Sequence, residues 1–354
     1  MNEIIKSFDE ITIDWLAQIL SKRYSITSQE IKGFQIKNNW NSTVSGTAII
    51  EINYKKNKLD LPESLFIKIT KSNLPEELKG FGEKEVRFYN EVAPKCEQSL
   101  ILFCYFAQYD ETNKIFNLVF EDLSRSHYVT EWPIPPTFEN CKLAIECLAR
   151  IQSFWWDHQD LQNIVAEFPT KKMFIVDFND FVNNDLQNFI DFMGDRLTEK
   201  RKEIMKRYID NFEILIDRFM TFKNITLIQK DAHFWNFLFP IKKEDPIKII
   251  DWQVYSYGLA TDDLAYMIAM HWYPDRRKEF EFKLLKNYHN VLLKNGISNY
   301  TFDDLIMDYK RSVIKMLFTP VEFWSKKINA EIWWSHLERI MLAFEDLNCI
   351  ELLN

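Results

Sequence analysis

The chain has 354 residues, and its 7 glycines fall well below the roughly 7 % that is usual in globular proteins. Neither G-x-G-x-x-G nor G-x-x-x-x-G-K-[ST] occurs in it, which excludes the dinucleotide-binding and P-loop classes. The 44 Lys and Arg against 52 Asp and Glu give a net charge of −8, which argues against nucleic acid as a partner because phosphate neutralisation needs a basic stripe. The length predicts two domains or one bilobed unit.

The five cysteines include no C-x-x-C and no zinc spacing, a pattern typical of reduced thiols in a cytosolic protein. The N-terminal residues lack a basic segment followed by an apolar one, so we expect no secretory signal. The longest apolar run, Leu100 to Ala107, has eight residues and is too short to cross a membrane. We therefore expect a cytoplasmic protein with no membrane partner.

The first third of the sequence predicts a small antiparallel sheet with two helices. Helical spacing of apolar residues begins near Asp14, and a second helical pattern runs from Gly82 to Val92. Runs of β-branched and aromatic residues predict two strands on each side of the second helix. These strands are expected at residues 47–54, 65–70, 100–109 and 115–120.

The remainder predicts a helical region with an embedded strand-loop-strand insert. Residues 124–136 carry three prolines and no clear period, which is typical of a connection. Helical patterns cover 138–157, then 187–222 with two helices, and they return after residue 262. We therefore predict an α+β chain with a small sheet domain at 1–120, a hinge and connection at 121–136, and a mainly helical domain at 137–354.

The insert carries residues suited to phosphoryl transfer. Asp231 is followed by Asn236, and Asp251 ends the mostly apolar run of residues 247–250. A loop carboxylate such as Asp231 can accept the proton of an attacking hydroxyl, and the oxygens of Asn236 and Asp251 are ligands of the type that Mg²⁺ prefers. Asp231 and Asn236 can also form an Asx turn or a helix cap, but three separated motifs in the required order favour function.

In the predicted sheet, Lys68 lies between apolar neighbours in LFIKIT, a setting in which a lysine needs a partner. Glu85, on the following helix, is the candidate, and protein-kinase-like folds use such a pair to hold nucleotide phosphates. Two alternatives stay open. Lys68 can extend to solvent from an edge strand, and Glu85 can be an exposed residue, since Glu83 is two positions away.

Three further sequence blocks sharpen this interpretation: DAHFWNFLF at 231–239, IIDWQ at 249–253 and GLATDDLAYMIA at 258–269. With them, the chain resembles the aminoglycoside phosphotransferase/choline kinase superfamily, and within it the ecdysteroid-kinase-like branch of small-molecule kinases. The resemblance extends over nearly the whole chain. It implies a bilobed protein-kinase-like fold, with a small antiparallel-sheet lobe followed by a larger, mainly helical lobe.

The resemblance also implies roles for individual residues. Asp231 would be the catalytic base, with Asn236 and Asp251 as the Mg²⁺ ligands. Lys68 would contact the phosphates and Glu85 would hold Lys68. The backbone of Glu121 to Leu123 would bind the base of ATP or GTP. Buried support would come from Asp263, which in this family ties the catalytic loop to the helical lobe.

Two departures from the family pattern affect these expectations. The family commonly has His-Gly-Asp where this chain has Gln229-Lys230-Asp231, and because glutamine can still hydrogen-bond the backbone, we expect retained chemistry. The phosphate loop, expected from Asn38 to Gly46, has a single glycine, so small polar side chains and turned backbone N–H groups would cradle the phosphates. The contacts expected there are Ser42, Thr43, Ser45 and Gly46.

Other polar and aromatic residues near the insert are candidates for support or for acceptor binding. His233 has no second His or Cys at ligand spacing, so we expect it to anchor the loop. An aromatic group can face an amine through a cation–π contact or fill the core, and core packing is the more usual outcome. The candidate acceptor contacts of this kind are Trp252, Tyr255 and Trp272, with Asp262, Asp275 and Glu322 as acids that could meet an amine.

The sequence thus predicts a kinase that moves the γ-phosphoryl group of ATP or GTP to a hydroxyl of a small, optionally amine-bearing acceptor, with Mg²⁺ as the metal. Its partners would be the nucleotide and a small-molecule alcohol. The alternative is a catalytically weak or inactive kinase-like protein that binds nucleotide, because of Gln229 and the glycine-poor loop. Protein phosphorylation is disfavoured, since no segment ending in A-P-E follows Asp251.

Overall fold

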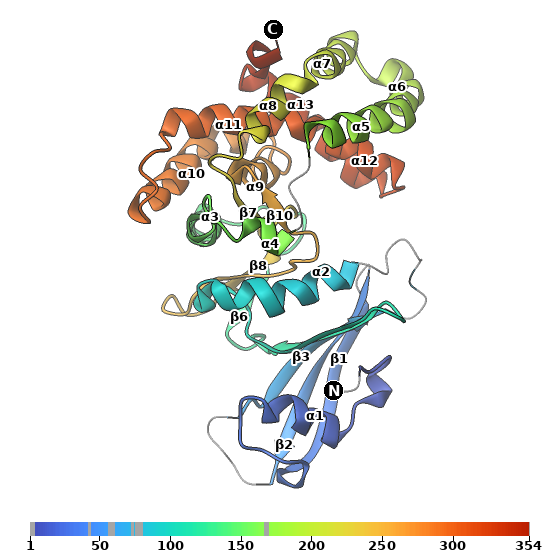
Figure 1. The fold of residues 1–354 in the computed structure, drawn as a ribbon, viewed down its shortest axis with the longest axis vertical. Helices are drawn as coiled ribbons and strands as arrows, with labels where there is room; N and C mark the ends of the chain where they lie inside the picture. The colour runs from blue at the N-terminus through green and yellow to red at the C-terminus, as the bar shows by residue number, and fades with distance from the viewer. Residues whose placement is uncertain are drawn as a thin grey trace. The chain divides into compact units, whose positions relative to one another are not determined.

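The computed structural model describes residues 4–41, 44–55, 61–71, 74, 81–165 and 170–353. The chain folds into two compact units, and most of their helices and strands are labelled in Figure 1. Unit 1 comprises residues 1–129 and 237–254, and unit 2 comprises residues 130–236 and 255–354. The segment 237–254, which we expected in the helical domain, therefore belongs to the unit that contains the N-terminal sheet.

Unit 1 is built on a five-stranded antiparallel sheet with the strand order β1-β2-β3-β5-β4. The strands are β1 (Ile31–Asn41), β2 (Ser45–Tyr54), β3 (Ser64–Thr70), β4 (Cys104–Asp110) and β5 (Ile115–Glu121). Side chains alternate between the two faces of a strand, and on β3 Leu65, Ile67 and Ile69 pack in one hydrophobic core with helix α1 (Ile13–Ser21). Lys68 therefore projects from the opposite face of the central strand.

Helix α2 (Phe81–Arg87) packs on β4 and β5 and continues into a π-helical turn at Phe88–Val92. Gly82 lies close to the ring of Phe116 on β5, where a Cβ atom would clash with the ring. The helix buries Glu85 and Val86. This close approach brings the buried side of α2 onto the sheet.

The segment 237–254 joins unit 1 through a second, three-stranded sheet. Its strands are β6 (His127–Tyr128), β8 (Phe237–Pro240) and β9 (Lys248–Ile249), in the order β6-β8-β9. Lys248 on β9 donates from Nζ to the carbonyl oxygen of Ile101 at 3.0 Å, and Ile249 forms a parallel bridge to Ile101. These bonds attach the end of β9, and with it Asp251, to the N-terminal unit.

Unit 2 is mainly helical, with one two-stranded antiparallel sheet formed by β7 (Thr226–Ile228) and β10 (Ser256–Gly258). Helix α3 packs on α10, and α9 packs on α11. The helices are α3 (Phe138–Phe154), α4 (Leu161–Val165), α5 (Lys171–Phe181), α6 (Gln187–Met193), α7 (Glu199–Asp210), α8 (Phe212–Met220), α9 (Ala260–Met267), α10 (Pro274–Lys294), α11 (Phe302–Lys315), α12 (Thr319–Ser325) and α13 (Ala330–Asp346).

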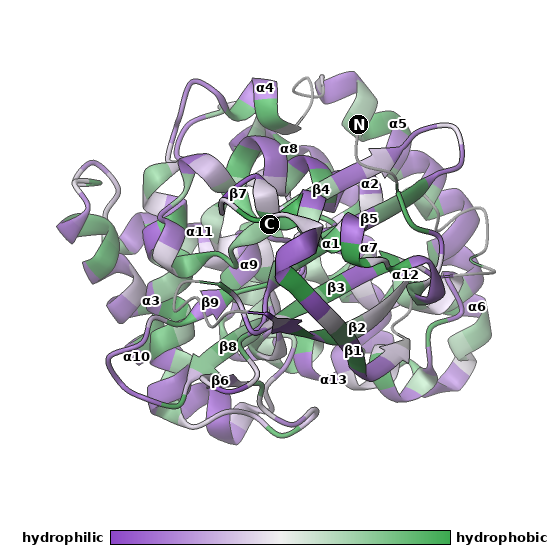
Figure 2. Cartoon of the chain, turned by 90° about the horizontal axis from the view of Figure 1, so that it is seen from below, coloured by the Kyte–Doolittle hydropathy of each residue, from purple (hydrophilic) through white to green (hydrophobic). Residues whose placement is uncertain are grey.

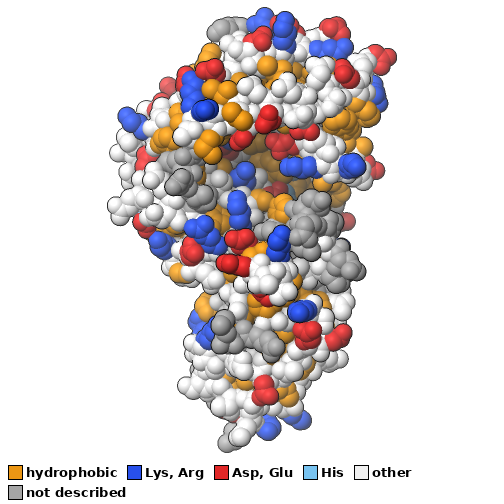
Figure 3. Space-filling view, turned by 45° about the vertical axis from the view of Figure 1, so that its right-hand side comes forward, with side chains coloured by type: hydrophobic (Ala, Val, Ile, Leu, Met, Phe, Trp, Pro, Cys, Tyr) orange, Lys and Arg blue, Asp and Glu red, His pale blue; other side chains and the backbone are white. Residues whose placement is uncertain are grey.

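The helices carry hydrophobic and hydrophilic residues together (Figure 2), as expected for helices with one buried side. Among the described residues, none of the helices combines the length and the apolar character needed to cross a membrane. The face in Figure 3 shows Lys and Arg side chains interspersed with Asp and Glu, without an extended basic stripe.

Most of the predicted elements of unit 1 are present, but β1 was missed in the five-stranded sheet and the short β6 was missed in the segment expected to be a connection. The predicted strands at 47–54, 65–70 and 115–120 and the helix at 82–92 are confirmed, while the strand expected from residue 100 begins at Cys104. Strand β1 was not predicted, because its sequence IKGFQIKNNWN is mostly polar. Its pairing with β2 reaches Asn41 and Gly46, so the predicted loop over 38–46 is wrong in extent: most of it is paired strand.

Candidate active site

In unit 1, three charged side chains from separate elements meet at Lys68. Lys68 Nζ donates to Glu85 Oε2 at 2.6 Å and to Asp251 Oδ1 at 3.0 Å. Lys68 comes from the central strand, so the alternative of a solvent-directed lysine on an edge strand is wrong. Glu85 is buried whereas Glu83 is exposed, so the predicted pairing of Lys68 with Glu85 is present.

Burial and neighbouring charges together shift the pKa values of Lys68 and Glu85. The side chains of Lys68 and Glu85 are 11 % and 3 % exposed. Burial alone would lower the pKa of Lys68, but the charges of Glu85 and Asp251 outweigh it, and the Lys68 pKa is raised above its usual value. Burial raises the pKa of Glu85, and the Lys68 charge opposes that shift. A charged lysine has three donors, and with two carboxylates bound, one donor remains without a partner among the described residues.

Asp251 occupies an unusual backbone conformation. Its φ of 63° is left-handed, a region uncommon for residues other than glycine, although Asp enters it more readily than most. The next residue, Trp252, is 1 % exposed and stacks on Phe88 with ring centroids 4.1 Å apart. This stack and the bond to Lys68 hold the turn after β9. Strained residues that their surroundings hold in place cluster at functional sites.

The residues expected to contact phosphate lie at the β1–β2 hairpin. Ser42 and Thr43 lie outside the described residues. Ser45 and Gly46 are the first residues of β2, paired with Thr70 and Ile69 of β3, and both are buried. The backbones of Ser45 and Gly46 therefore belong to the paired sheet.

The expected hinge residues follow β5. The Glu121 side chain forms an ion pair with Lys248 at 3.2 Å, so its carboxylate is engaged within unit 1. The carbonyl oxygen of Leu123 accepts the amides of Ser126 and His127. Its own N–H donates to none of the described residues, which leaves the Leu123 amide as the donor that a nucleotide base could use.

In unit 2, the predicted catalytic loop follows β7 and is held by hydrogen bonds around Asp231. The Gln229 side chain accepts the Asp231 amide at 2.8 Å, which is the backbone contact expected of glutamine at this position. Asn236 Nδ2 donates to the Asp231 carbonyl oxygen at 2.9 Å. The Tyr266 hydroxyl donates to Asp231 Oδ1 at 2.9 Å. His233 donates its amide to the Asp231 carbonyl oxygen at 2.8 Å, a contact within the loop.

Asp263, on α9, connects this loop to the helices of unit 2. It is fully buried and accepts the amides of Gln229 and Lys230, both at 2.9 Å, and Gln152 Nε2 at 3.0 Å. Burial raises the Asp263 pKa to about 7, and the two backbone donors oppose this shift. Lys230 has a left-handed φ of 67°, and the Asp263 contact holds that turn.

Two of these residues offer oxygen donors suited to a hard cation. Asn236 uses Nδ2 on Asp231, and its Oδ1 accepts no hydrogen bond from a described residue. The Asp251 carboxylate is 30 % exposed. Mg²⁺ usually takes one or two protein ligands and completes its shell with water and phosphate, so the free oxygens of each residue, taken separately, are of the kind that suits Mg²⁺. Within the described ranges, no group of three or more His, Cys, Asp or Glu is placed to hold a metal ion by itself.

A model of the ecdysteroid kinase-like family matches residues 42–297, more than half of the chain. The chain belongs to the ecdysteroid kinase-like family. This makes it a member of a family of small-molecule kinases, phosphotransferases with a hydroxyl group as the acceptor. No curated protein sequence matches the chain.

Solved structures share the fold of this ecdysteroid kinase-like protein at low identity. Plasmodium vivax ethanolamine kinase is 11 % identical, with a TM-score of 0.54 over 90 % of this chain and 84 % of that chain. A choline/ethanolamine kinase family protein from Mesorhizobium loti is 9 % identical, with a TM-score of 0.53 over 97 % and 98 %. The GDP complex of an aminoglycoside 2'-phosphotransferase-IIIa is 12 % identical, with a TM-score of 0.51 over 94 % and 96 %. The predicted kinase-like fold is confirmed.

The aromatic residues considered as acceptor contacts lie in the core of this ecdysteroid kinase-like chain. Trp252 stacks on Phe88, as described above. Tyr255 is 2 % exposed, and Trp272 stacks on the buried Phe234. Asp262, considered for an amine, is bound by Lys315 at 2.6 Å and is 5 % exposed at its side chain. These side chains take part in packing or internal pairing, and for the aromatic residues core packing is the outcome that the sequence favoured.

Sequence reasoning gave no role to Tyr266, whose hydroxyl binds Asp231. A signal for it was present, because Tyr266 lies three residues after Asp263 on a predicted helix, and residues three apart share a helix face. Gln152, which binds Asp263 from α3, has no comparable signal. Its contact spans 111 residues of sequence and depends on helix packing.

Proposed function

We propose that this chain is a Mg²⁺-dependent kinase that transfers the γ-phosphoryl group of ATP or GTP to a hydroxyl of a small molecule. The observation that carries the proposal is the charged Lys68, bound by Glu85 and Asp251 and left with one donor for a phosphate oxygen. The aminoglycoside 2'-phosphotransferase-IIIa, which has a similar fold, was solved as a GDP complex. This supports a nucleoside triphosphate as the donor of the phosphoryl group.

In the proposed reaction, Asp231 accepts the proton of the acceptor hydroxyl. The acceptor oxygen forms the new bond to the γ-phosphorus while the bond to the bridging oxygen breaks, and the nucleoside diphosphate leaves with that electron pair. Lys68 binds phosphate oxygens and Glu85 holds its ammonium group. The Leu123 amide donates to the nucleotide base. Asn236 and Asp251 would hold Mg²⁺, which neutralises phosphate charge when bound.

Little covalent chemistry falls to the protein in phosphoryl transfer, so positioning and electrostatics dominate. A positioned base contributes about 10²–10⁴-fold to the rate. The Asp231→Asn variant keeps the size of the side chain and removes its basicity. We expect it to lose this factor in kcat while the nucleotide still binds.

The test combines binding with turnover. Thermal unfolding is recorded with Mg·ATP and Mg·GTP, and nucleoside diphosphate release is measured with ethanolamine, choline, an aminoglycoside and an ecdysteroid as acceptors. At 100 times Kd a ligand adds about 2.7 kcal/mol of stability, so binding is readily seen. Asp231→Asn with the turnover of the unmodified protein would refute the base. Binding without release for any acceptor would favour the inactive alternative.

A further inference from the structure

We propose that Tyr266 is a positioning residue for Asp231, and that His271 in turn holds Tyr266. This inference rests on the proposed function, because it assigns the orientation of the proposed base. Tyr266 donates its hydroxyl to Asp231 Oδ1 at 2.9 Å. His271 Nδ1 lies 2.6 Å from the carbonyl oxygen of Tyr266. All three residues belong to unit 2.

One helix holds the catalytic loop at two points. From α9, Asp263 binds the amides of Gln229 and Lys230, which precede Asp231. One turn later, Tyr266 binds the Asp231 carboxylate itself. Residues three apart share a helix face. The same helix, α9, therefore holds both the backbone of the loop and the Asp231 side chain. The torsion angles of the Asp231 side chain are thereby restricted independently of any ligand.

The Tyr266 contact distinguishes the two oxygens of the carboxylate. Oδ1 accepts the phenol at 2.9 Å, and a hydrogen bond to a carboxylate is among the stronger kinds. Oδ2 lies 3.5 Å from Asn236 Nδ2 and 3.7 Å from His233 Nε2, both longer than the 2.9 Å bond from Tyr266 to Oδ1. Because the phenol makes Oδ1 the less basic oxygen, Oδ2 takes the acceptor proton, and the O–H electron pair stays on the acceptor oxygen as it bonds to phosphorus.

His271 stabilises the end of the same helix. The last carbonyls of a helix lack partners within it, and α9 ends at Met267. The carbonyl oxygen of Tyr266 can only accept, so His271 carries its proton on Nδ1 in this bond. His271 is buried and lies against His336 of α13, with ring centroids 4.8 Å apart. Burial lowers the pKa of His271, with His336 and His233 adding to the shift, so the ring is neutral.

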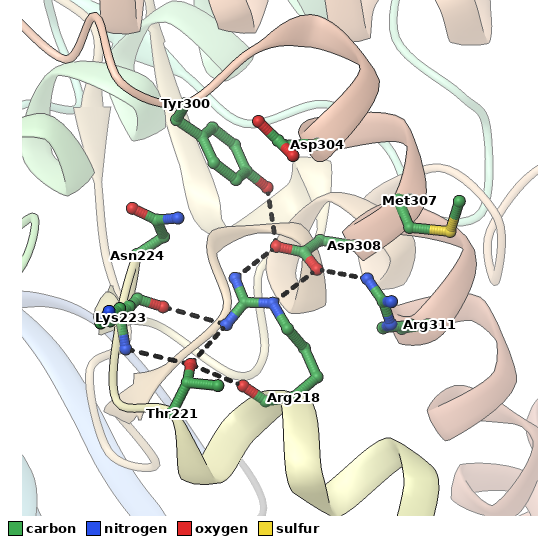
Figure 4. Close-up of a pocket in the computed structure, with 9 residues that line it drawn as sticks. All are labelled: Arg218, Thr221, Lys223, Asn224, Tyr300, Asp304, Met307, Asp308 and Arg311. Carbon is green, nitrogen blue, oxygen red and sulfur yellow. Dashed lines mark hydrogen bonds and ion pairs between the residues drawn. The ribbon is translucent and has the colours of Figure 1, made fainter.

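A matched control is present elsewhere in unit 2. Tyr300 also donates its hydroxyl to a carboxylate, Asp308 Oδ2, at 3.0 Å. Figure 4 shows this pair with Arg218 and Arg311 around Asp308, lining a cavity of about 340 Å³. Tyr300→Phe therefore removes a chemically similar bond from a network that contains none of the proposed catalytic residues.

The experiment compares Tyr266→Phe with Tyr300→Phe. Each variant is assayed for thermal unfolding, for the KM of ATP, and for kcat with the best acceptor of the panel above or, if none reacts, with water as the acceptor. We expect similar losses of thermal stability in both. Hydrogen bonds to charged groups are the stronger ones, so kcat should fall about 10- to 100-fold in Tyr266→Phe. It should stay within about 2-fold in Tyr300→Phe, with the KM of ATP unchanged in both.

A second pair of variants tests the link to His271 should Tyr266→Phe fail to fold. In His271→Gln the amide can still donate to the Tyr266 carbonyl oxygen, whereas in His271→Leu it cannot. We expect kcat to be retained in the first and lowered several-fold in the second. Equal kcat for Tyr266→Phe and the unmodified protein overturns the positioning role alone, and equal kcat for both His271 variants overturns the part of His271. Absence of turnover in the unmodified protein overturns the proposed function and this inference together.

Discussion

Replacing Lys68 by methionine is the sharpest test of the charged cluster in unit 1. Methionine keeps most of the length of the side chain and removes its charge. Glu85, 3 % exposed, would then be a buried carboxylate without its cation. Asp251, 30 % exposed, would lose the same partner but remain partly hydrated, so most of the cost should come from Glu85.

The size of the effect follows from the chemistry left to Glu85. A buried carboxylate without a partner takes up a proton instead of remaining charged. Protonating a glutamate with an ordinary pKa near 4.3 costs roughly 3–4 kcal/mol at pH 7, at about 1.4 kcal/mol per pH unit. This agrees with the roughly 3–5 kcal/mol lost when one partner of a buried ion pair is removed.

The sign of the pH dependence is also determined. In Lys68→Met the folded-state pKa of Glu85 lies above its unfolded value, so the protonated group favours folding at low pH and this stability is lost as the pH rises. The loss relative to the unmodified protein should therefore shrink to roughly 1 kcal/mol at pH 5. The double variant Lys68→Met with Glu85→Gln should be more stable than Lys68→Met at pH 7 and show a smaller dependence on pH.

Urea unfolding of the apo protein between pH 5 and 8 measures these differences, with Glu85→Gln completing the double-mutant cycle. Nucleotide binding is measured in parallel, because Lys68→Met should also weaken ATP binding. A loss of stability that is the same at pH 5 and pH 7 would refute the assignment of Glu85 as a buried carboxylate that depends on Lys68.

Two further predictions concern the packing of α2 and the support of the catalytic loop. Gly82→Ala places a Cβ against the Phe116 ring, and such overpacking costs about 1–3 kcal/mol; thermal unfolding should show a loss that Gly33→Ala, with open space where its Cβ would lie, does not. Asp263, with a folded-state pKa of about 7, contributes stability that is present below its ordinary pKa near 3.9 and is lost as the pH rises through about 7. The difference in unfolding free energy between the unmodified protein and Asp263→Asn should therefore decrease from pH 4 to pH 7.5, and a flat difference would contradict the raised pKa.

Much of the fold could be predicted because apolar patterns identify strands and helices independently of their partners. Strand β1 was not predicted because part of it lacks such an apolar pattern. In its first half, Phe34 and Ile36 pack on the hydrophobic core. Its second half, KNNWN, has no apolar alternation and is held by the pairing with β2, which extends to Asn41 and Gly46. A strand segment that is held mainly by backbone hydrogen bonds to its neighbour cannot be recognised from the pattern of its own side chains.

Some residues of the candidate site could be identified from the sequence, and others could not. Lys68 could be singled out because a lysine among apolar strand residues needs a counter-charge. The choice between Glu83 and Glu85 could not be made, because the helix is short and continues into a π-helical turn at Phe88–Val92. Such a turn shifts the phase of a helix, so a period read across the whole segment does not locate its buried face.

The scarcity of glycine bears on the site in a way that composition alone does not show. The turns before Asp231 and at Asp251 are left-handed, yet they are formed by Lys230, at φ 67°, and by Asp251 itself, at φ 63°. The left-handed conformation costs Lys230 roughly 1–2 kcal/mol and Asp251 less. Each is held by a specific contact, from Asp263 to the Lys230 amide and from Lys68 to the Asp251 carboxylate. The same contacts that orient the proposed catalytic groups thus offset the backbone strain, so removing either one should release the turn as well as the side chain.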